Sequence, residues 1–137
     1  MYSKIMVPID LAHTDRLGKA LAVTGKLAAA FGAEVHLVGV AERVPSSAAR
    51  DPREFAEKLE AYAGEQTRTL GIPCTAHAKI VLDLGAELEA GLVESAEEIG
   101  ADLVVMASHA PNFLDRIFGS NAGALAAHAN LSVFVVR

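Results

Sequence analysis

The residues best suited to chemistry lie in one segment near the C-terminal end, from Ala107 to Asn121, which reads ASHAPNFLDRIFGSN. An apolar run precedes it, and Gly119-Ser120-Asn121 stands where a short Ala-rich helix is predicted to begin. The first turn of a helix offers free backbone N–H groups and the positive end of the helix dipole, both of which attract phosphate. Two interpretations stay open on this pattern: a phosphate site, or an ordinary loop in which Ser120 caps the helix.

Motifs typical of catalysis are missing from the sequence. It has neither the Gly-x4-Gly-Lys-Ser/Thr phosphate loop nor the Gly-x-Gly-x-x-Gly dinucleotide fingerprint. No pair of carboxylates and no activated nucleophile is recognisable, so binding is favoured over enzymatic activity. His13, His36, His77 and His128 show no metal-ligand spacing and are interpreted as surface or edge residues, and Cys74 is interpreted as a packing residue.

The elements that position this segment alternate between two hydrophobic periodicities. Short apolar runs predict strands, and apolar residues at three- and four-residue steps predict helices. Asp51 and Pro52 are expected to open the second helix, and the alternating polarity of residues 74–81 indicates a half-exposed edge strand. The predicted strands are 5–9, 35–40, 74–81, 103–107 and 132–136, and the predicted helices are 15–31, 52–70, 86–99 and 120–129.

This alternation predicts an α/β fold, a three-layer sandwich with a mainly parallel sheet between two layers of helices. Ligands of such folds bind at the carboxyl ends of the strands, where the strand order reverses. The site is therefore expected where residues 8–10 follow the first strand and where Ser108 follows the fourth.

Composition limits the classes of protein to consider. The chain has 137 residues, a hydrophobic fraction of 52% and a net charge of −5, which together predict one domain, 1–137, with a substantial core. No basic stripe indicates a nucleic-acid partner, and no apolar run is long enough for a membrane helix. With one cysteine and no recognisable signal peptide, a cytoplasmic location is expected.

The two ends of the sequence resemble the universal stress protein family. The C-terminal segment LVVMASHAPNFLDRIFGSNAGALAAHANLSVFVVR matches the family's pattern of apolar strand, Gly-Ser/Thr-His, loop, Gly-Ser, helix and Val-rich strand. The opening KIMVPIDLAHTD and the segment AEEIGAD are similar to the family as well. The resemblance implies a five-stranded sheet of order 3-2-1-4-5 with four helices, the adenine nucleotide alpha hydrolase-like fold.

The resemblance also implies a ligand. Nucleotide-binding members carry a Gly-x2-Gly-x9-Gly-Ser/Thr loop, whereas this chain has Ala107 and Ala110 at the two glycines and only eight residues before Gly119. The shorter loop resembles a nucleotide-binding subgroup whose loop reads Gly-Ser-His-Arg-Pro. Loss of the arginine contact at position 110 costs ~1.5–3 kcal/mol, or about ten- to a hundredfold in affinity. We therefore expect adenine nucleotide binding that is weakened rather than abolished.

By resemblance, one group of residues contacts adenine and another contacts ribose and phosphates. Asp10 would accept from base or ribose, or hold Mg²⁺ indirectly; an equally weighted alternative is that it caps the first helix. His109 would assist the phosphates or bond to backbone. The adenine group is Pro8, Ile9, Asp10, Val40 and Met106, and the ribose and phosphate group is Ala107, His109, Ala110, Gly119, Ser120 and Asn121.

The implied function is a stress-response or signalling module that binds ATP with Mg²⁺. The alternative is a nucleotide-free module of the same family that acts through dimerisation and partner surfaces. In either case a homodimer is expected through the closing strand, which begins at Ser132 and runs to Arg137, because an apolar strand at a bare sheet edge tends to pair.

Overall fold

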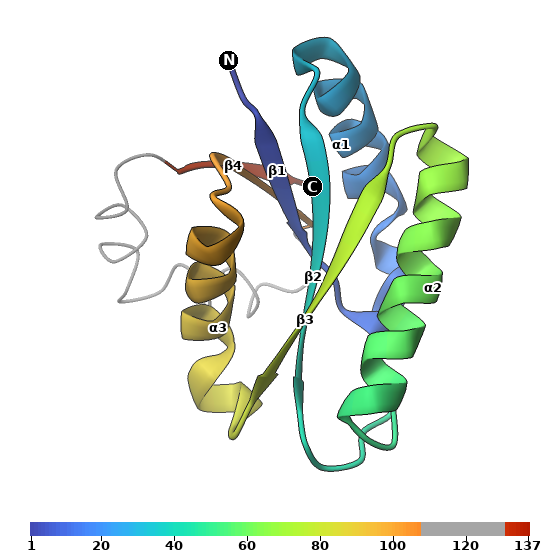
Figure 1. Ribbon diagram of the computed structural model, residues 1–137, viewed down its shortest axis with the longest axis vertical. Helices are drawn as coiled ribbons and strands as arrows, with labels where there is room; N and C mark the ends of the chain where they lie inside the picture. Colours follow the sequence, from blue (N-terminus) through green and yellow to red (C-terminus); the bar gives the residue numbers. More distant parts are fainter. Residues whose placement is uncertain (108–130) are drawn as a thin grey trace.

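Five parallel strands form one sheet in the order β3-β2-β1-β4-β5 (Figure 1). The structure is a computed structural model that describes residues 1–107 and 131–137. Every neighbouring pair of strands is parallel, which confirms the predicted fold class and strand order. The strands are β1 (Lys4–Pro8), β2 (Glu34–Glu42), β3 (Cys74–Val81), β4 (Leu103–Ala107) and β5 (Ser132–Val136).

Helices cover both faces of the sheet. Helices α1 (Gly18–Phe31) and α2 (Pro52–Leu70) lie on one face and α3 (Leu84–Ile99) on the other, and a 3-10 turn, η1 (Leu11–Arg16), precedes α1 (Figure 1). The fourth predicted helix, 120–129, falls outside the described residues. Within residues 1–107 and 131–137, no helix is long and apolar enough to cross a membrane.

The core is divided by the sheet into two apolar layers. On the side of α1 and α2, Ile5, Val7 and Leu37 pack with Leu59 and other buried residues. On the side of α3, Met6 and Val38 pack with Leu92 and Ile99. Successive side chains of a strand point to opposite faces of the sheet, and helices cover both faces. A central strand such as β1 is therefore buried on both sides, as its continuous apolar run predicts.

Helix ends follow local capping chemistry. Asp51 accepts a hydrogen bond from the backbone N–H of Glu54 at 2.8 Å, and Pro52 occupies the first turn, as predicted. Each α-helix within residues 1–107 ends in a left-handed glycine, a conformation that side chains with a Cβ rarely adopt. These glycines are Gly32, Gly71 and Gly100, with φ of 65°, 69° and 75°.

Several predicted boundaries are wrong. The first helix does not start at residue 15, because a separate 3-10 turn with a kink at His13 occupies residues 11–16. β2 continues two residues past Val40, to Glu42, because β3 pairs with it over that length. α3 starts at Leu84 rather than at residue 86, because Asp83 caps it.

One interpretation of the histidines is also wrong. His36 is not a surface residue: its side chain is only 12% exposed, because β2 is an interior strand between β1 and β3. His77 does lie on an edge strand, β3, where its side chain contacts that of His36.

Candidate functional site at the carboxyl edge of the sheet

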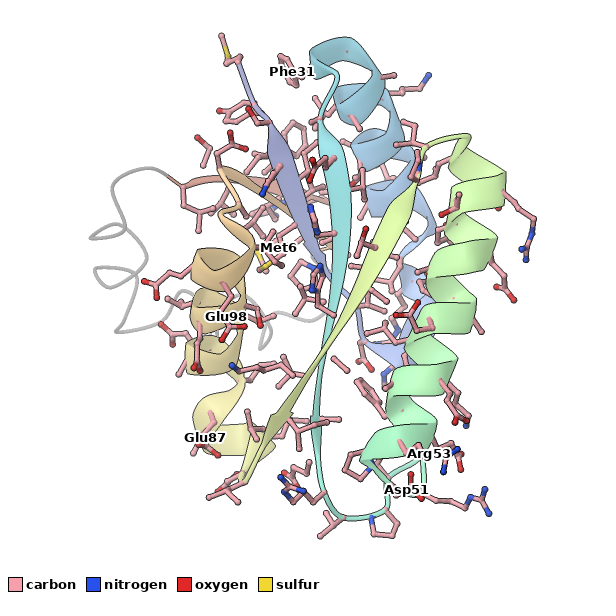
Figure 2. All side chains as sticks on the ribbon, in the orientation of Figure 1. Met6, Phe31, Asp51, Arg53, Glu87 and Glu98 are labelled. Carbon is pink, nitrogen blue, oxygen red and sulfur yellow. The ribbon has the colours of Figure 1, made fainter. Side chains whose placement is uncertain are left out.

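The carboxyl ends of the strands and the amino ends of α2 and α3 meet at one edge of the molecule. Figure 2 shows Asp51 and Arg53 at the start of α2 and Glu87 at the start of α3, both at this edge. Parallel βα units always produce this arrangement, because each helix starts where its strand ends. The edge therefore gathers free backbone N–H groups beside the segments that follow the strands.

The end of β1 delivers three of the predicted residues to this edge. Ile9 is buried, and its N–H donates to the carbonyl of Val38 at 2.8 Å, which extends the pairing of β1 with β2. The following residue, Asp10, turns outward and keeps its carboxylate more than half exposed. The sequence thus places an exposed carboxylate directly beside a buried apolar wall.

Asp10 caps the turn that follows it. Its Oδ1 accepts from the N–H of Ala12 at 3.0 Å, and its Oδ2 lies 2.9 Å from Nδ1 of His13. The capping alternative is therefore realised, although on η1 rather than on α1. Because each carboxylate oxygen retains further lone pairs, the cap does not exclude a ligand from Asp10.

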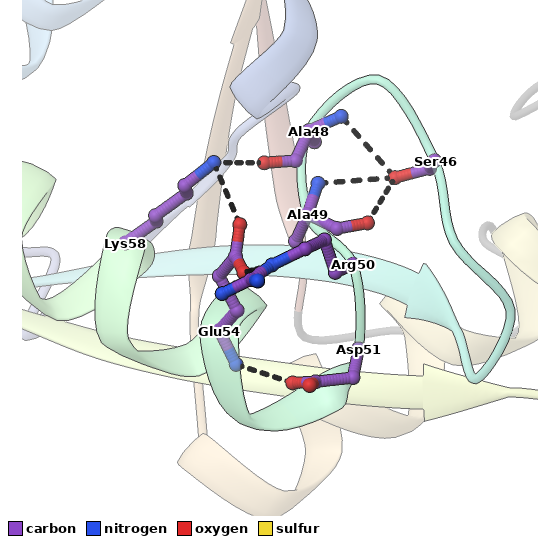
Figure 3. A network of polar contacts seen from close by, with 7 residues as sticks. All are labelled: Ser46, Ala48, Ala49, Arg50, Asp51, Glu54 and Lys58. Atoms are coloured by element: carbon purple, nitrogen blue, oxygen red, sulfur yellow. Dashed lines mark hydrogen bonds and ion pairs between the residues drawn. The ribbon is translucent and has the colours of Figure 1, made fainter.

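The loop after β2, residues 43–51, is tied together by its own polar groups (Figure 3). Oγ of Ser46 accepts from the N–H groups of Ala48 and Ala49, and the Ser46 N–H donates to the carbonyl of Ala49 at 2.8 Å. Nζ of Lys58 on α2 donates to the carbonyl of Ala48 at 2.7 Å. These bonds fix the loop against the start of α2.

A carboxylate at the start of α2 completes this network. Hydrogen bonds from Arg50 and then from Lys58 lower the pKa of Glu54 below its usual range (Figure 3). The charge of Lys58 is thus shared between a carboxylate and the loop carbonyl. The loop is expected to hold its shape at neutral pH, where Glu54 is ionised.

A cleft of about 380 Å³ opens between β1, β2, this loop and the start of α3. Most of its lining is apolar, and no lysine or arginine is among the described residues that line it. Its polar side chains are Asp10, Glu42, Ser46 and Ser47. An apolar cleft with a few polar groups is typical of small-molecule binding sites.

The structure brings four of the predicted residues to this cleft and leaves two outside it. Pro8, Ile9, Asp10 and Val40 all line it. Met106 does not, because its side chain is buried with the core residues under α3, where it lines a small cavity of about 20 Å³ that Pro8 also borders. Ala107 ends β4 half-buried and packs on the opposite core layer. The predicted residues His109, Ala110, Gly119, Ser120 and Asn121 lie outside the described residues.

Sequence reasoning missed much of the cleft wall. Glu42 ends β2, and its Oε1 accepts from the N–H of Leu84 at 2.7 Å, which ties the start of α3 to the cleft. Leu88 on α3 and Val44 in the loop complete the wall. The sequence did hold one signal for this longer wall: the apolar stretch continues past Val40 into Ala41, which allows β2 to extend further.

Comparison with known proteins settles the family. The sequence model of the universal stress protein family matches residues 1–137. The chain belongs to the universal stress protein family. Universal stress protein G of Shigella flexneri is 35% identical over 147 aligned positions that cover all of both chains.

Solved structures agree with the fold. A universal stress protein in complex with cAMP superposes with a TM-score of 0.65, at 19% identity, and covers 99% of this chain and 97% of its own. The universal stress protein from Archaeoglobus fulgidus in complex with dAMP superposes with a TM-score of 0.62, at 21% identity, over 99% and 98% of the two chains. These universal stress proteins share the adenine nucleotide alpha hydrolase-like fold.

Proposed function

We propose that this universal stress protein binds an adenine nucleotide at the cleft after β1 and β2, and acts as a stress-response or signalling module. The observation that carries the proposal is the cleft itself, which lies at the carboxyl ends of β1 and β2, the edge where ligands of parallel sheets bind, and is lined by Ile9, Asp10 and Val40. Family members of the same fold are named as complexes with cAMP and dAMP, which supports an adenine ligand.

The chemistry of the cleft suits the nucleoside part of such a ligand. Adenine is planar and mostly apolar on its faces, which matches a wall that includes Ile9 and Val40. A volume of about 380 Å³ lies within the usual range of about 300–1,000 Å³ for small-molecule sites. Asp10 can accept a hydrogen bond from a ribose hydroxyl while it caps η1.

The phosphates are assigned to the segment from Ser108 to Asn121, on the sequence pattern alone. Because the described wall of the cleft has no basic side chain, backbone N–H groups at Gly119-Ser120-Asn121 and bound Mg²⁺ would have to balance their charge. Ala107 and Ala110 stand where nucleotide-binding relatives have glycine, or arginine in the short-loop subgroup. We propose ATP with Mg²⁺ as the ligand, bound weakly and hydrolysed slowly or not at all.

Titration calorimetry and thermal unfolding with ATP, ADP, AMP, cAMP and GTP test this proposal, with and without Mg²⁺. A ligand at 100 times its dissociation constant adds about 2.7 kcal/mol to the free energy of unfolding, which shifts the melting temperature measurably. No heat and no shift with any adenine nucleotide at millimolar concentration would overturn the proposal. Equal responses to GTP and ATP would contradict an adenine-specific cleft.

A matched pair of variants locates the site. Asp10→Asn keeps an oxygen that can cap η1 but removes the charge, and we expect it to weaken nucleotide binding about tenfold or more, because a hydrogen bond to a charged group contributes ~1.5–3 kcal/mol. Asp51→Asn makes the same change at the cap of α2, which does not line the cleft, and should leave affinity unchanged. An equal loss of nucleotide affinity in Asp10→Asn and Asp51→Asn would contradict the assignment of the ligand to this cleft.

A gain-of-affinity variant tests the two substituted loop positions. Ala107→Gly combined with Ala110→Arg restores the residues of the short-loop subgroup, and we expect about a tenfold or greater increase in ATP affinity. An unchanged affinity would show that these positions are not the source of weakness. The proposal assigns no catalytic base or nucleophile, so it predicts nothing about a rate of ATP hydrolysis in this variant.

The second candidate function is a nucleotide-free module that acts as a homodimer through β5. The observation in its favour is that Val133 and Phe134 are 36% and 44% exposed on a strand at the edge of the sheet. Light scattering at micromolar concentration should give the mass of a dimer, and Phe134→Lys should give a monomer. A monomeric wild-type protein would contradict this second candidate function. A dimer is also compatible with nucleotide binding.

A further inference from the structure

Two histidines from neighbouring strands converge on the face of the sheet that α3 covers. His36 shares a face of β2 with Val38, which packs under α3, because successive strand residues alternate between faces. His77 stands opposite Val38 in the pairing of β2 with β3, so the two histidines are diagonal neighbours. Neither residue lines the nucleotide cleft.

The two rings present nitrogen atoms to each other. Nδ1 of His36 lies 2.9 Å from Nε2 of His77, and the ring centroids are 5.1 Å apart at an angle of 36°. A contact of this length requires one nitrogen to carry a hydrogen and the other a lone pair. The contact of the second ring nitrogen of His36, Nε2, indicates which of the two histidines is the donor.

Glu34 determines which nitrogen of His36 carries hydrogen. Its Oε2 lies 3.0 Å from Nε2 of His36, and an ionised carboxylate can only accept, so Nε2 of His36 carries a hydrogen, and in the neutral ring Nδ1 holds the lone pair. His77 is then the donor, through its Nε2–H. A carboxylate that accepts from one ring nitrogen, as Glu34 does from Nε2 of His36, is the arrangement found behind metal-bound histidines, and here Nδ1 faces a second imidazole nitrogen.

We propose that Nδ1 of His36 and Nε2 of His77 bind one divalent copper or nickel ion, with water completing its coordination. The ion takes the place of the shared hydrogen. His77 releases the proton from Nε2 and takes one up at Nδ1, so the ring stays neutral and no net proton is lost. Glu34 is a positioning residue, because it orients the His36 ring without touching the ion.

The distance between the two nitrogens favours copper or nickel over zinc. Two imidazole nitrogens at about 2.0–2.1 Å from a metal are about 2.8–3.0 Å apart when they subtend 90°, as in tetragonal sites of Cu²⁺ and Ni²⁺. At the tetrahedral angle of Zn²⁺ they are about 3.3–3.4 Å apart. The observed 2.9 Å matches the tetragonal value, and rotation about the soft χ2 torsions can turn both lone pairs toward one ion.

The charges around the pair suit a cation. Lys79, the neighbouring cation on β3, is held by Glu94 at 3.2 Å and Glu98 at 3.1 Å on α3, so carboxylates offset its charge. The carboxylates that act on the pair or on Lys79 are Glu34, Glu60, Glu94 and Glu98. In the described part of the chain, no group of three or more histidine, cysteine or carboxylate side chains is placed to hold a metal, so the site has two protein ligands.

Titration of the 137-residue protein with Cu²⁺ in a non-coordinating buffer tests the site, with calorimetry for affinity and pulsed EPR for the ligands. We expect one site per chain and an EPR signal from two imidazoles on one Cu²⁺. His36→Ala and His77→Ala should each lower the affinity at least about tenfold, and Glu34→Ala about tenfold, with recovery in Glu34→Gln, whose amide oxygen can still accept. Zn²⁺ should bind more weakly than Cu²⁺.

Two control variants and the wild-type spectrum make the test decisive. His13→Ala removes an exposed histidine outside the pair, and Cys74→Ser removes the thiol; neither should change the affinity. A wild-type spectrum with a single imidazole, or an unchanged affinity in His77→Ala, would overturn the proposal. The wild-type spectrum gives this answer even if a histidine variant fails to fold.

Discussion

Gly39 is the position where the packing of α2 on β2 can be tested most sharply. A Cβ at Gly39 would lie 2.8 Å from Cζ and 3.1 Å from Cε1 of Phe55, and 3.2 Å from Cδ2 of Leu59. The shortest of these distances is closer than real Cβ contacts allow. Phe55 and Leu59 are 4% and 0% exposed, so the Leu59 methyl group has no free space to enter and the Phe55 ring can move only toward the cleft that it lines.

Gly39→Ala is expected to destabilise the protein by about 1–3 kcal/mol, the usual cost of overpacking a filled core. With ~2.1 cal/mol/K of unfolding entropy per residue, a chain of 137 residues loses about 3–4 °C of melting temperature per kcal/mol, so the fall should be about 3–10 °C. Urea denaturation and calorimetry measure both quantities. The double change with Phe55→Leu should recover part of the loss, because the two residues are in contact.

Gly64 supplies the control. A Cβ there meets only Nη1 of Arg68, at 3.9 Å, and Gly64 lies within α2, so Gly64→Ala should stabilise the protein by about 0.5–1 kcal/mol through helix propensity. Phe55 also lines the nucleotide cleft, so its displacement in Gly39→Ala should change nucleotide affinity as well as stability. A Gly39→Ala protein as stable as the wild type would refute the packing argument.

Three further predictions, one substitution and two measurements on the wild-type protein, test other parts of the structure. Asp102→Ala removes an acceptor that binds the N–H groups of Ser3 and Lys4 at 2.8 and 3.0 Å, and should lower the free energy of unfolding by about 1–3 kcal/mol in urea denaturation. Burial raises the pKa of Tyr62 to about 12, whereas a tyrosine in the unfolded chain ionises near pH 10. The free energy of unfolding should therefore fall as the pH rises above about 10. Absorbance at 295 nm follows the ionisation of Tyr62 and should give the higher midpoint in the folded protein. Burial raises the pKa of the Cys74 thiol, so a disulfide reagent should label it more slowly at pH 8 in the folded than in the unfolded protein.

Each of these has a clear contrary result. An Asp102→Ala protein with unchanged stability would show that the N-terminal end of β1 is held by strand pairing alone. The chain has two tyrosines, so a Tyr2→Phe variant isolates Tyr62, and a midpoint near 10 would contradict its burial. Equal labelling rates of Cys74 in folded and unfolded protein would contradict the protected thiol.

The sequence predicts the elements of this fold well because their signals are local. Asp51-Pro52 opens α2, Gly71 and Gly100 close helices, and the apolar run of β4 lies where the sequence places it. The start of α1 was predicted wrongly because the turn at residues 11–16 competes with the helix, and Asp10 stabilises the turn. Hydrophobic periodicity does not distinguish a 3-10 turn from the first turn of an α-helix.

The candidate site was predicted only in part because its walls come from distant segments. The family resemblance placed the end of β1 and Val40 around one part of the ligand, and in the structure they line one cleft. The placement of Met106 depends on which face of β4 each residue takes, and the sequence does not show which face α3 covers. The contact between His36 and His77 spans 41 residues and depends on the diagonal register of two strands, for which the sequence gives no local signal.

The strand order also sets the order in which a growing chain completes its sheet. β1 lies between β2 and β4, and β2 is available by residue 42, whereas β4 ends only at Ala107. During synthesis of the intervening residues, β1, β2 and β3 can pair and pack under α1 and α2 while the other edge of β1 and the face under Met6 remain bare. A chain in which β4 has not yet paired with β1 therefore presents an open apolar edge.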